Sequence, residues 1–155
     1  AHQFSHENLI RIIEYCQTIN VGLSVPEPHI VADENQGTTV LNSPSLEGPQ
    51  IIISMPLAKL SGNCDGMAGP HTFILYTLEK AKEMTATKCN VVGQYLATIN
   101  MLNKVLGKFS ADIGGQGLPG VCPLLADMEL IEIEVLPAAG VFGGWNGYSA
   151  AITLK

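Results

Sequence analysis

Charged side chains are scarce in this chain. Only 22 of its 155 residues are charged, 8 of them basic and 14 acidic, which is about half the usual share of roughly 25 %. Yet no apolar run reaches the roughly 20 residues that a membrane-spanning helix needs, because Gly, Pro, Asn, Ser or Thr interrupt every long uncharged stretch. We therefore expect a subunit whose apolar surface is partly covered by other copies of the chain.

Basic residues are too few to form a patch, and Arg11 is the only arginine. With a net charge of −6, the sequence lacks the cluster of positive charge that binds nucleic-acid phosphates or anionic membrane surfaces. It also lacks a secretory leader pattern. We expect no nucleic-acid partner and no membrane insertion, in a cytoplasmic protein, a virion protein or a secreted mature chain.

Closely spaced cysteine pairs, which structural zinc sites use, are absent. Cys16, Cys64, Cys89 and Cys122 lie far apart, and their spacing selects none of the three disulfide pairings that four cysteines allow. A domain of this length folds without bridges, so free buried thiols are expected. No glycine-rich segment has the pattern of a P-loop or of a dinucleotide-binding turn. We expect no cofactor, and no motif identifies a family.

The hydrophobic pattern predicts an α+β fold in a single domain over residues 1–155. An N-terminal helix is expected after Ser5, which has the side chain of an N-cap, because apolar residues then recur at helical spacing from Leu9 to Ile19. Helix formers dominate residues 71–108 and predict a central helical region, with a weak joint at 85–90.

Three segments predict strands of a mixed or antiparallel sheet. The apolar run near 50–55 is typical of a strand covered on both faces, whereas the alternation near 129–136 and 148–154 is typical of strands with one exposed face. The last two strands are expected to pair in antiparallel fashion. The segment between them, residues 137–147, is too long for a tight hairpin, although Asn146-Gly147 could form a local turn.

Segments rich in glycine and proline are expected to lack regular structure. Residues 23–50 should be extended or looped, with at most a short strand near 38–41. Residues 61–70 and 111–126 should be loops, the first leading into the central helical region.

One grouping brings a thiol, a carboxylate and an imidazole together in sequence, namely Cys64, Asp65 and His71. At a helix N-terminus the thiol pKa would fall, and the histidine could act as a base for a nucleophilic cysteine. Cys64, Met67 and His71 also match the soft ligand set of copper. Neighbours in sequence need not meet in space, so a plain surface loop is the simpler interpretation. We treat these residues as weak candidates and assign no catalytic or metal-binding role.

The densest aromatic cluster follows at residues 141–148. Phe142, Trp145, Asn146 and Tyr148 lie there among glycines, and aromatic side chains on such segments supply contact area at ligand or subunit interfaces. Alternatively, Trp145 and Phe142 fold back and close the open end of the sheet. Both interpretations stay open at this point.

Two functional hypotheses follow. The first is a non-enzymatic structural subunit of a homo-oligomeric assembly, such as a shell, tube, filament or virion component, whose partners are other copies of itself. The second is a cofactor-independent enzyme or ligand-binding protein, with a small ligand held between the Cys64/His71 loop and the Trp145 loop.

Overall fold

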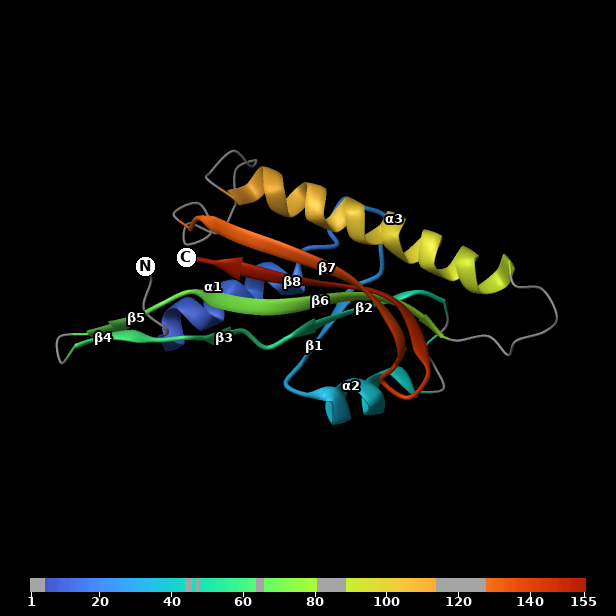
Figure 1. Ribbon diagram of the computed structural model, residues 1–155, viewed down its shortest axis with the longest axis horizontal. Helices are drawn as coiled ribbons and strands as arrows, with labels where there is room; N and C mark the ends of the chain where they lie inside the picture. Colours follow the sequence, from blue (N-terminus) through green and yellow to red (C-terminus); the bar gives the residue numbers. More distant parts are fainter. Residues whose placement is uncertain (1–4, 44–45, 47, 64–65, 81–88, 114–127) are drawn as a thin grey trace.

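A computed structural model describes residues 5–43, 46, 48–63, 66–80, 89–113 and 128–155 of the chain. Three helices and a mixed sheet within these residues confirm the α+β class (Figure 1). The elements are, in order, α1 (His6–Gln17), β1 (Pro28–Val31), α2 (Glu34–Leu41), β2 (Gln50–Ser54), β3 (Leu57–Ala58), β4 (Ser61–Asn63), β5 (Gly66–Ala68), β6 (His71–Lys80), α3 (Cys89–Asp112), β7 (Leu130–Val141) and β8 (Trp145–Leu154).

The main sheet has the strand order β1-β2-β6-β8-β7. β1 and β2 are parallel, and every other pair in this sheet is antiparallel. The short strand β3 pairs with β6 on the same side as β2. β4 and β5 form a separate hairpin that projects from the end of the sheet where β3 lies (Figure 1). None of the helices in the described ranges has both the length and the apolar character of a membrane crossing.

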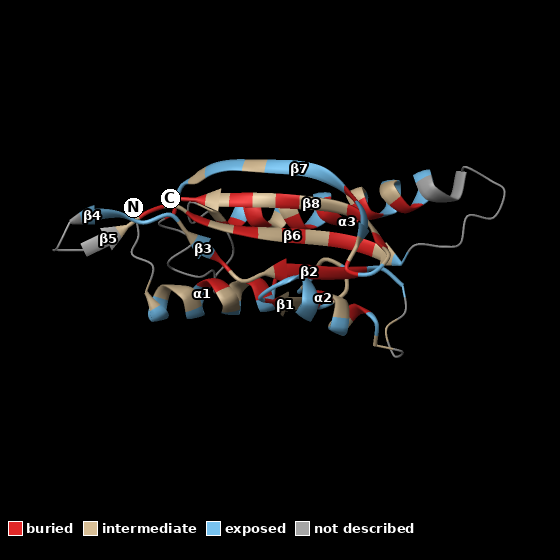
Figure 2. Ribbon diagram, turned by 60° about the horizontal axis from the view of Figure 1, so that its bottom comes forward, coloured by how far each residue is buried: buried red, intermediate tan, exposed pale blue. Residues whose placement is uncertain are grey.

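Side chains on the two faces of the sheet form two apolar cores. The large core lies beneath α1 and α3 and includes Ile51, Phe73 and Leu75. The small core lies on the opposite face, where α2 and the curled end of β7 and β8 pack over Ile52 (Figure 2). We call these two sides of the sheet the α1/α3 face and the α2 face. Alternating residues of one strand therefore serve different cores, as the pleat requires.

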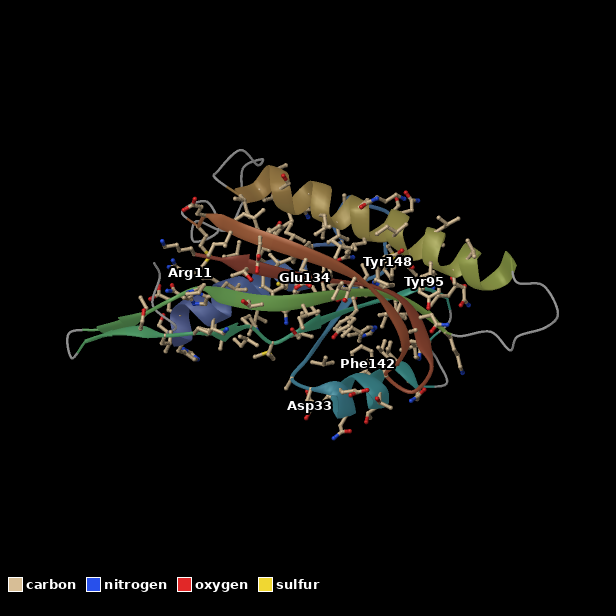
Figure 3. All side chains as sticks on the ribbon, in the orientation of Figure 1. Arg11, Asp33, Tyr95, Glu134, Phe142 and Tyr148 are labelled. Carbon is tan, nitrogen blue, oxygen red and sulfur yellow. The ribbon has the colours of Figure 1, made fainter. Side chains whose placement is uncertain are left out.

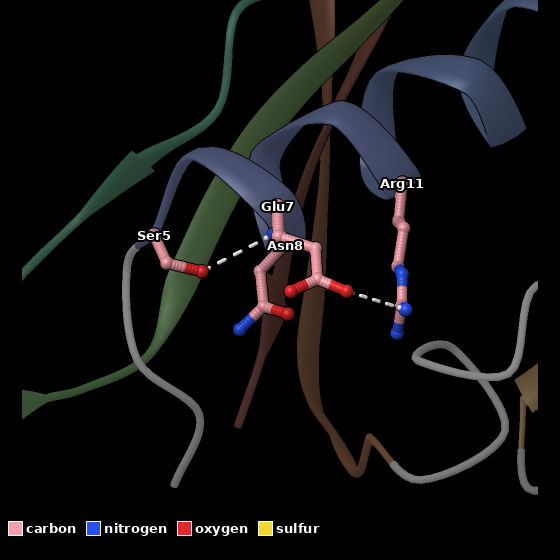
Figure 4. Close-up of polar contacts among 4 residues, drawn as sticks. All are labelled: Ser5, Glu7, Asn8 and Arg11. Atoms are coloured by element: carbon pink, nitrogen blue, oxygen red, sulfur yellow. Dashed lines mark hydrogen bonds and ion pairs between the residues drawn. The ribbon is translucent and has the colours of Figure 1, made fainter.

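α1 begins where its sequence predicts. The Ser5 side chain accepts a hydrogen bond from the Asn8 backbone N–H at 3.2 Å and so caps the first turn. Arg11 and Glu7, one helical turn apart, form an ion pair at 2.7 Å (Figure 4). Cys16 is buried in α1, whereas Cys64, Cys122 and the side chain of Cys89 lie outside the described residues.

The expected central helical region is wrong in its first part. Residues 71–80 form strand β6, and only the second part is helical, as α3. Burial in β6, which lies between β2 and β8, alternates strictly from His71 to Thr77. Side chains on the α1/α3 face are buried along this stretch, whereas those on the α2 face are half-buried. The strand also has a local basis, because its first part holds the strand formers Thr72, Phe73, Ile74, Tyr76 and Thr77. The helix formers Glu79 and Lys80 come only at its end. α3 also continues past residue 108, where the helical region was expected to end, to Asp112.

The long connection before β2 is more regular than expected. Residues 38–41 belong to helix α2 and not to a short strand. The Asp33 carboxylate accepts a hydrogen bond from the Gln36 N–H at 2.8 Å, and the Gln36 side chain accepts one from the Ala32 N–H at 2.8 Å. This reciprocal capping starts the helix. The expected loop 61–70 likewise contains the β4–β5 hairpin, whereas most of the expected loop 111–126 lies outside the described residues.

The connection between the last two strands is a tight hairpin, in contrast to the expectation. β7 continues to Val141 and β8 starts at Trp145. The three residues between them turn the chain with positive φ angles of 50° at Phe142, 81° at Gly143 and 116° at Gly144. Asn146 lies within β8, and its side-chain oxygen accepts a hydrogen bond from the Gly140 N–H at 2.8 Å. The glycines permit this conformation, which other residues rarely adopt.

Candidate functional site

Of the predicted thiol and metal candidates, His71 alone has a described side chain. His71 is the first residue of β6, faces the large core and is fully buried. Cys64 and Asp65 lie outside the described residues, as does the side chain of Met67. Within the described part of the chain, no three His, Cys, Asp or Glu side chains lie close enough together to hold a metal ion.

The two halves of the hypothetical ligand site lie at opposite ends of the sheet. His71 pairs with Leu154, whereas Trp145 pairs with Lys80, nine residues further along β6. At about 3.4 Å per residue this separates them by roughly 30 Å. They also face different cores, so one small ligand could not contact both side chains.

The aromatic segment closes one end of the sheet. Trp145 and Phe142 are 1 % and 5 % exposed and belong to the small core. The Phe142 ring meets Tyr76 edge to face, with centroids 5.0 Å apart. Tyr148 points to the α1/α3 face, half-buried, and meets Tyr95 of α3 at 6.0 Å (Figure 3). These rings contact other parts of the same chain.

A pocket of about 230 Å³ lies beside these rings, near the first turn of α2. Its walls include Phe142, Tyr76, Ser54 and the acidic pair Asp33 and Glu34. Burial, and in second place the nearby Glu34 carboxylate, raises the pKa of Tyr76 above its ordinary value. The Ser54 hydroxyl accepts a hydrogen bond from the Ile74 N–H at 2.8 Å.

This pocket is smaller than the 300–1,000 Å³ or so of sites for drug-sized ligands. Its described walls contain neither histidine nor cysteine, the base and thiol of a typical nucleophilic site. Its two carboxylates disfavour an anionic ligand. Sequence reasoning missed this pocket because its walls come from segments far apart in the chain, although the Asp33-x-x-Gln36 pattern was a signal for the helix start beside it.

The most unusual surface is the outer strand β7. Its large apolar residues Ile131, Val135 and Leu136 are 50 %, 40 % and 51 % exposed. No described strand pairs with its outer side. Glu132 and Glu134 are exposed as well, and Glu134 is labelled in Figure 3. Both faces of β7 are therefore largely open, so the expectation of a single exposed face is wrong for this strand. Its outer backbone groups have no strand partner among the described residues.

A second apolar surface lies at the opposite edge, along β3 and the two residues after it. Leu57 and Leu60 are 52 % and 42 % exposed, and Lys59 between them is exposed. β3 pairs only with β6 among the described strands. Each edge of this end of the sheet thus combines exposed apolar residues with charge, acidic on β7 and basic at Lys59.

The outer side of α3 is almost uncharged. Its exposed positions include Val92 and Leu96 at 57 % and 63 %. The other exposed positions of the described helix are Gly93, Ala97, Asn100, Asn103, Lys104, Gly107, Ser110 and Ala111. Lys104 is the one charged residue in this set. The described outer surface of this helix is therefore poor in charge.

Comparison with known proteins gives no relative: no family model matches the chain, and no curated protein matches it.

Proposed function

We propose that this chain is a non-enzymatic structural subunit of a homo-oligomeric assembly, of the kind that forms a shell, tube, filament or virion component. The observation that supports this proposal most strongly is strand β7. It is 12 residues long, lies at the edge of the sheet, and exposes 40–51 % of Ile131, Val135 and Leu136. A neighbour that covers these side chains gains roughly 25 cal/mol for each Å² of apolar surface removed from water.

An edge strand also offers backbone hydrogen bonds to a neighbour. Natural proteins protect such edges from random pairing with bulges, prolines and charges. β7 has a bulge near Ile131, Pro137 in its middle and the carboxylates of Glu132 and Glu134. These features do not cover the apolar side chains, but they restrict the strands that can pair here. We infer selective contact with one kind of partner.

The outer side of α3 supports the same proposal. A solvent-facing helix side normally carries many charged residues. Among the described exposed positions of α3, Lys104 is the one charged residue. Apolar and small residues at such positions suit packing against a neighbouring subunit, since obligate interfaces resemble a domain core cut in half.

Size-exclusion chromatography with light scattering tests this proposal. At low micromolar concentration we expect a mass that is a multiple of 16.5 kDa. Leu136→Asp should lower that mass, because it places a charge in the covered surface. Val21→Asp is the matched control, since Val21 is 64 % exposed but lies on neither edge. A wild-type mass of 16.5 kDa at all concentrations up to the millimolar range would refute the proposal.

A further inference from the structure

We propose that the two exposed edges of the sheet join copies of the chain head to tail, with Lys59 of one copy opposite Glu134 of the next. This inference rests on the proposed function, because it names the surface through which the subunits would meet. The partner of the β7 edge is then a second copy of this chain, which contributes residues 57–61.

The strand directions suit such a junction. β3 is antiparallel to β6, β6 to β8, and β8 to β7. β3 and β7 therefore run in opposite directions within one copy. When a second copy is placed beside the first in the same orientation, its β3 lies antiparallel to β7 of the first. The sheet then continues from one copy into the next with antiparallel hydrogen bonding.

The outward-pointing backbone groups of β7 follow from its pairing with β8. Glu129 and Lys155 exchange both backbone hydrogen bonds, at 3.0 and 2.8 Å. Backbone groups alternate in direction along a strand, so the odd-numbered residues of β8 point toward β7. Their partners are the even-numbered residues 132–138 of β7. Ile133 and Val135 consequently direct their N–H and C=O groups outward, and Pro137 at the next outward position has no N–H to donate.

The same reasoning gives the backbone directions at the edge formed by β3. The Lys59 N–H donates to the Pro70 carbonyl at 3.3 Å and thus points inward. Its neighbours Ala58 and Leu60 therefore direct their backbone groups outward. Each edge thus has two residues, two positions apart, whose backbone N–H and C=O groups point outward.

One register matches the outward groups of both edges. It places Ala58 opposite Val135 and Leu60 opposite Ile133. The same register places Lys59 opposite Glu134, and Leu57 opposite Leu136. These last two pairs are not hydrogen-bonded pairs, and in such pairs the side chains approach most closely.

The side chains of both pairs lie on the same face of the sheet. Leu57 pairs with Thr72, which pairs with Thr153, and these residues are on the α2 face. Glu134 and Leu136 lie on this face too, since they pair with Ala151 and Ser149. Strand alternation returns Lys59 to the face of Leu57. The register therefore brings opposite charges together and covers two exposed leucines at once.

Other registers are less favourable. A shift of two residues in one direction keeps a charge pair, Lys59 with Glu132, but it places Leu57 opposite the charge of Glu134 and Leu60 at the bulge near Ile131. A shift in the other direction places Lys59 opposite Leu136, and Pro137, which lacks an N–H, opposite Ala58.

Pairing of β7 with β7 of another copy is disfavoured as well. Centred on Ile133 or on Glu134, it brings glutamates opposite each other, and like charges in this position are destabilising. Centred on Val135, it places Pro137 opposite Ile133, so that one hydrogen bond is lost. β7 has no basic residue that could offset the repulsion between these glutamates.

The register also determines the stagger between copies. Within one copy, Leu57 lies in the same row as Glu132, across Thr72 and Thr153. At the junction Leu57 lies opposite Leu136, four residues further on, which is a shift of about 13 Å along the strand. Because the contact is head to tail, the copies form a closed ring or an open helical filament. A constant stagger accompanies the strand tilt of closed sheets.

A charge-swap experiment tests this junction. Lys59→Glu and Glu134→Lys are prepared separately, with Glu14→Lys on the exposed side of α1 as control, and circular dichroism verifies that each variant is folded. Light scattering over a concentration series gives the dissociation constant of the assembly. Each edge variant alone should raise this constant about tenfold, since a charge attraction becomes a repulsion. The control should leave it unchanged.

Mixing the two edge variants is the decisive step. In an equimolar mixture every junction between unlike copies has opposite charges, so we expect assembly within about threefold of the wild-type constant. A wild-type protein that assembles while Lys59→Glu has no effect would overturn the junction but leave the subunit function standing. Loss of assembly that mixing does not restore would overturn the junction too. A wild-type protein that never assembles would refute the proposed function itself.

Discussion

Strands β2 and β7 are both rich in apolar residues, yet they have opposite environments (Figure 2). In β2 the residues Gln50 to Ile53 are all buried, because a core lies on each face and a strand on each side. In β7 only Ala138 is classed as buried. An apolar strand in the middle of the sheet stabilises the fold, whereas one at the edge presents a surface to a partner.

The largest expected effect comes from truncating one apolar side chain in each of these two strands. Ile52→Ala removes fully buried atoms and should lower the free energy of unfolding by about 2–5 kcal/mol. Leu136→Ala, at the half-exposed edge, should change it by less than about 0.5 kcal/mol in dilute protein. Urea unfolding followed by the fluorescence of Trp145 measures both. Equal losses would mean that β7 contributes to stability like an interior strand.

Glycine substitutions provide a second test of interior against edge. A Cβ at Gly147 of β8 would lie 2.0 Å from the Thr77 carbonyl oxygen, so β8 and β6 would have to separate. We expect Gly147→Ala to cost about 3 kcal/mol. Gly140 near the end of β7 has open space around it but a φ of 65°, so Gly140→Ala should cost only about 1 kcal/mol. Thermal unfolding compares the two, and a larger loss at Gly140 would contradict the strand packing described above.

The cap of α2 should have a smaller effect. Asp33→Ala removes the acceptor of the Gln36 N–H and should cost about 1 kcal/mol, whereas Asp33→Asn keeps a capping side chain and should be nearly neutral. Chemical unfolding of both variants tests this. An equal loss in the two would show that the charge, and not the cap, matters.

The smallest effect concerns Tyr76 in the pocket. Since the folded state holds the pKa of Tyr76 above 10.0, the unfolded chain loses this proton first as the pH rises. The contribution of Tyr76 to stability is therefore complete below pH 10 and decreases above it. Tyr76→Phe should make the decline in stability above pH 10 shallower. Between pH 7 and 9 the free energies of unfolding of the variant and the wild type should differ by a constant amount. An unchanged alkaline slope would contradict the burial of the hydroxyl.

Local signals predicted α1 and β2. The Ser5 cap with its apolar periodicity defines the helix, and the isoleucine run at 51–53 suits only a strand buried on both faces. β6 carried a local signal that was missed, because Thr72, Phe73, Ile74, Tyr76 and Thr77 are strand formers, whereas the helix formers at its end favoured a helix. The tight hairpin was missed since Phe142, a residue that normally avoids positive φ, occupies the turn.

The candidate surfaces were predictable only in part. The sequence indicated a strand at 129–136 with exposed glutamates, and it indicated an apolar chain that needs a partner. It could not indicate that this strand is the outermost one, because strand order depends on contacts between distant segments. The buried positions of His71 and Trp145, at opposite ends of the sheet, follow from the same topology.

Hydrogen exchange at two protein concentrations tests most directly whether a second copy covers β7. Amides of β2 should exchange equally slowly in dilute and concentrated protein, because their protection comes from within one subunit. Exchange of the outward amides of Ile133 and Val135 should slow markedly as concentration rises, together with those of Ala58 and Leu60. Exchange at β7 that is fast and independent of concentration would contradict the assembly of this protein through its outer strand.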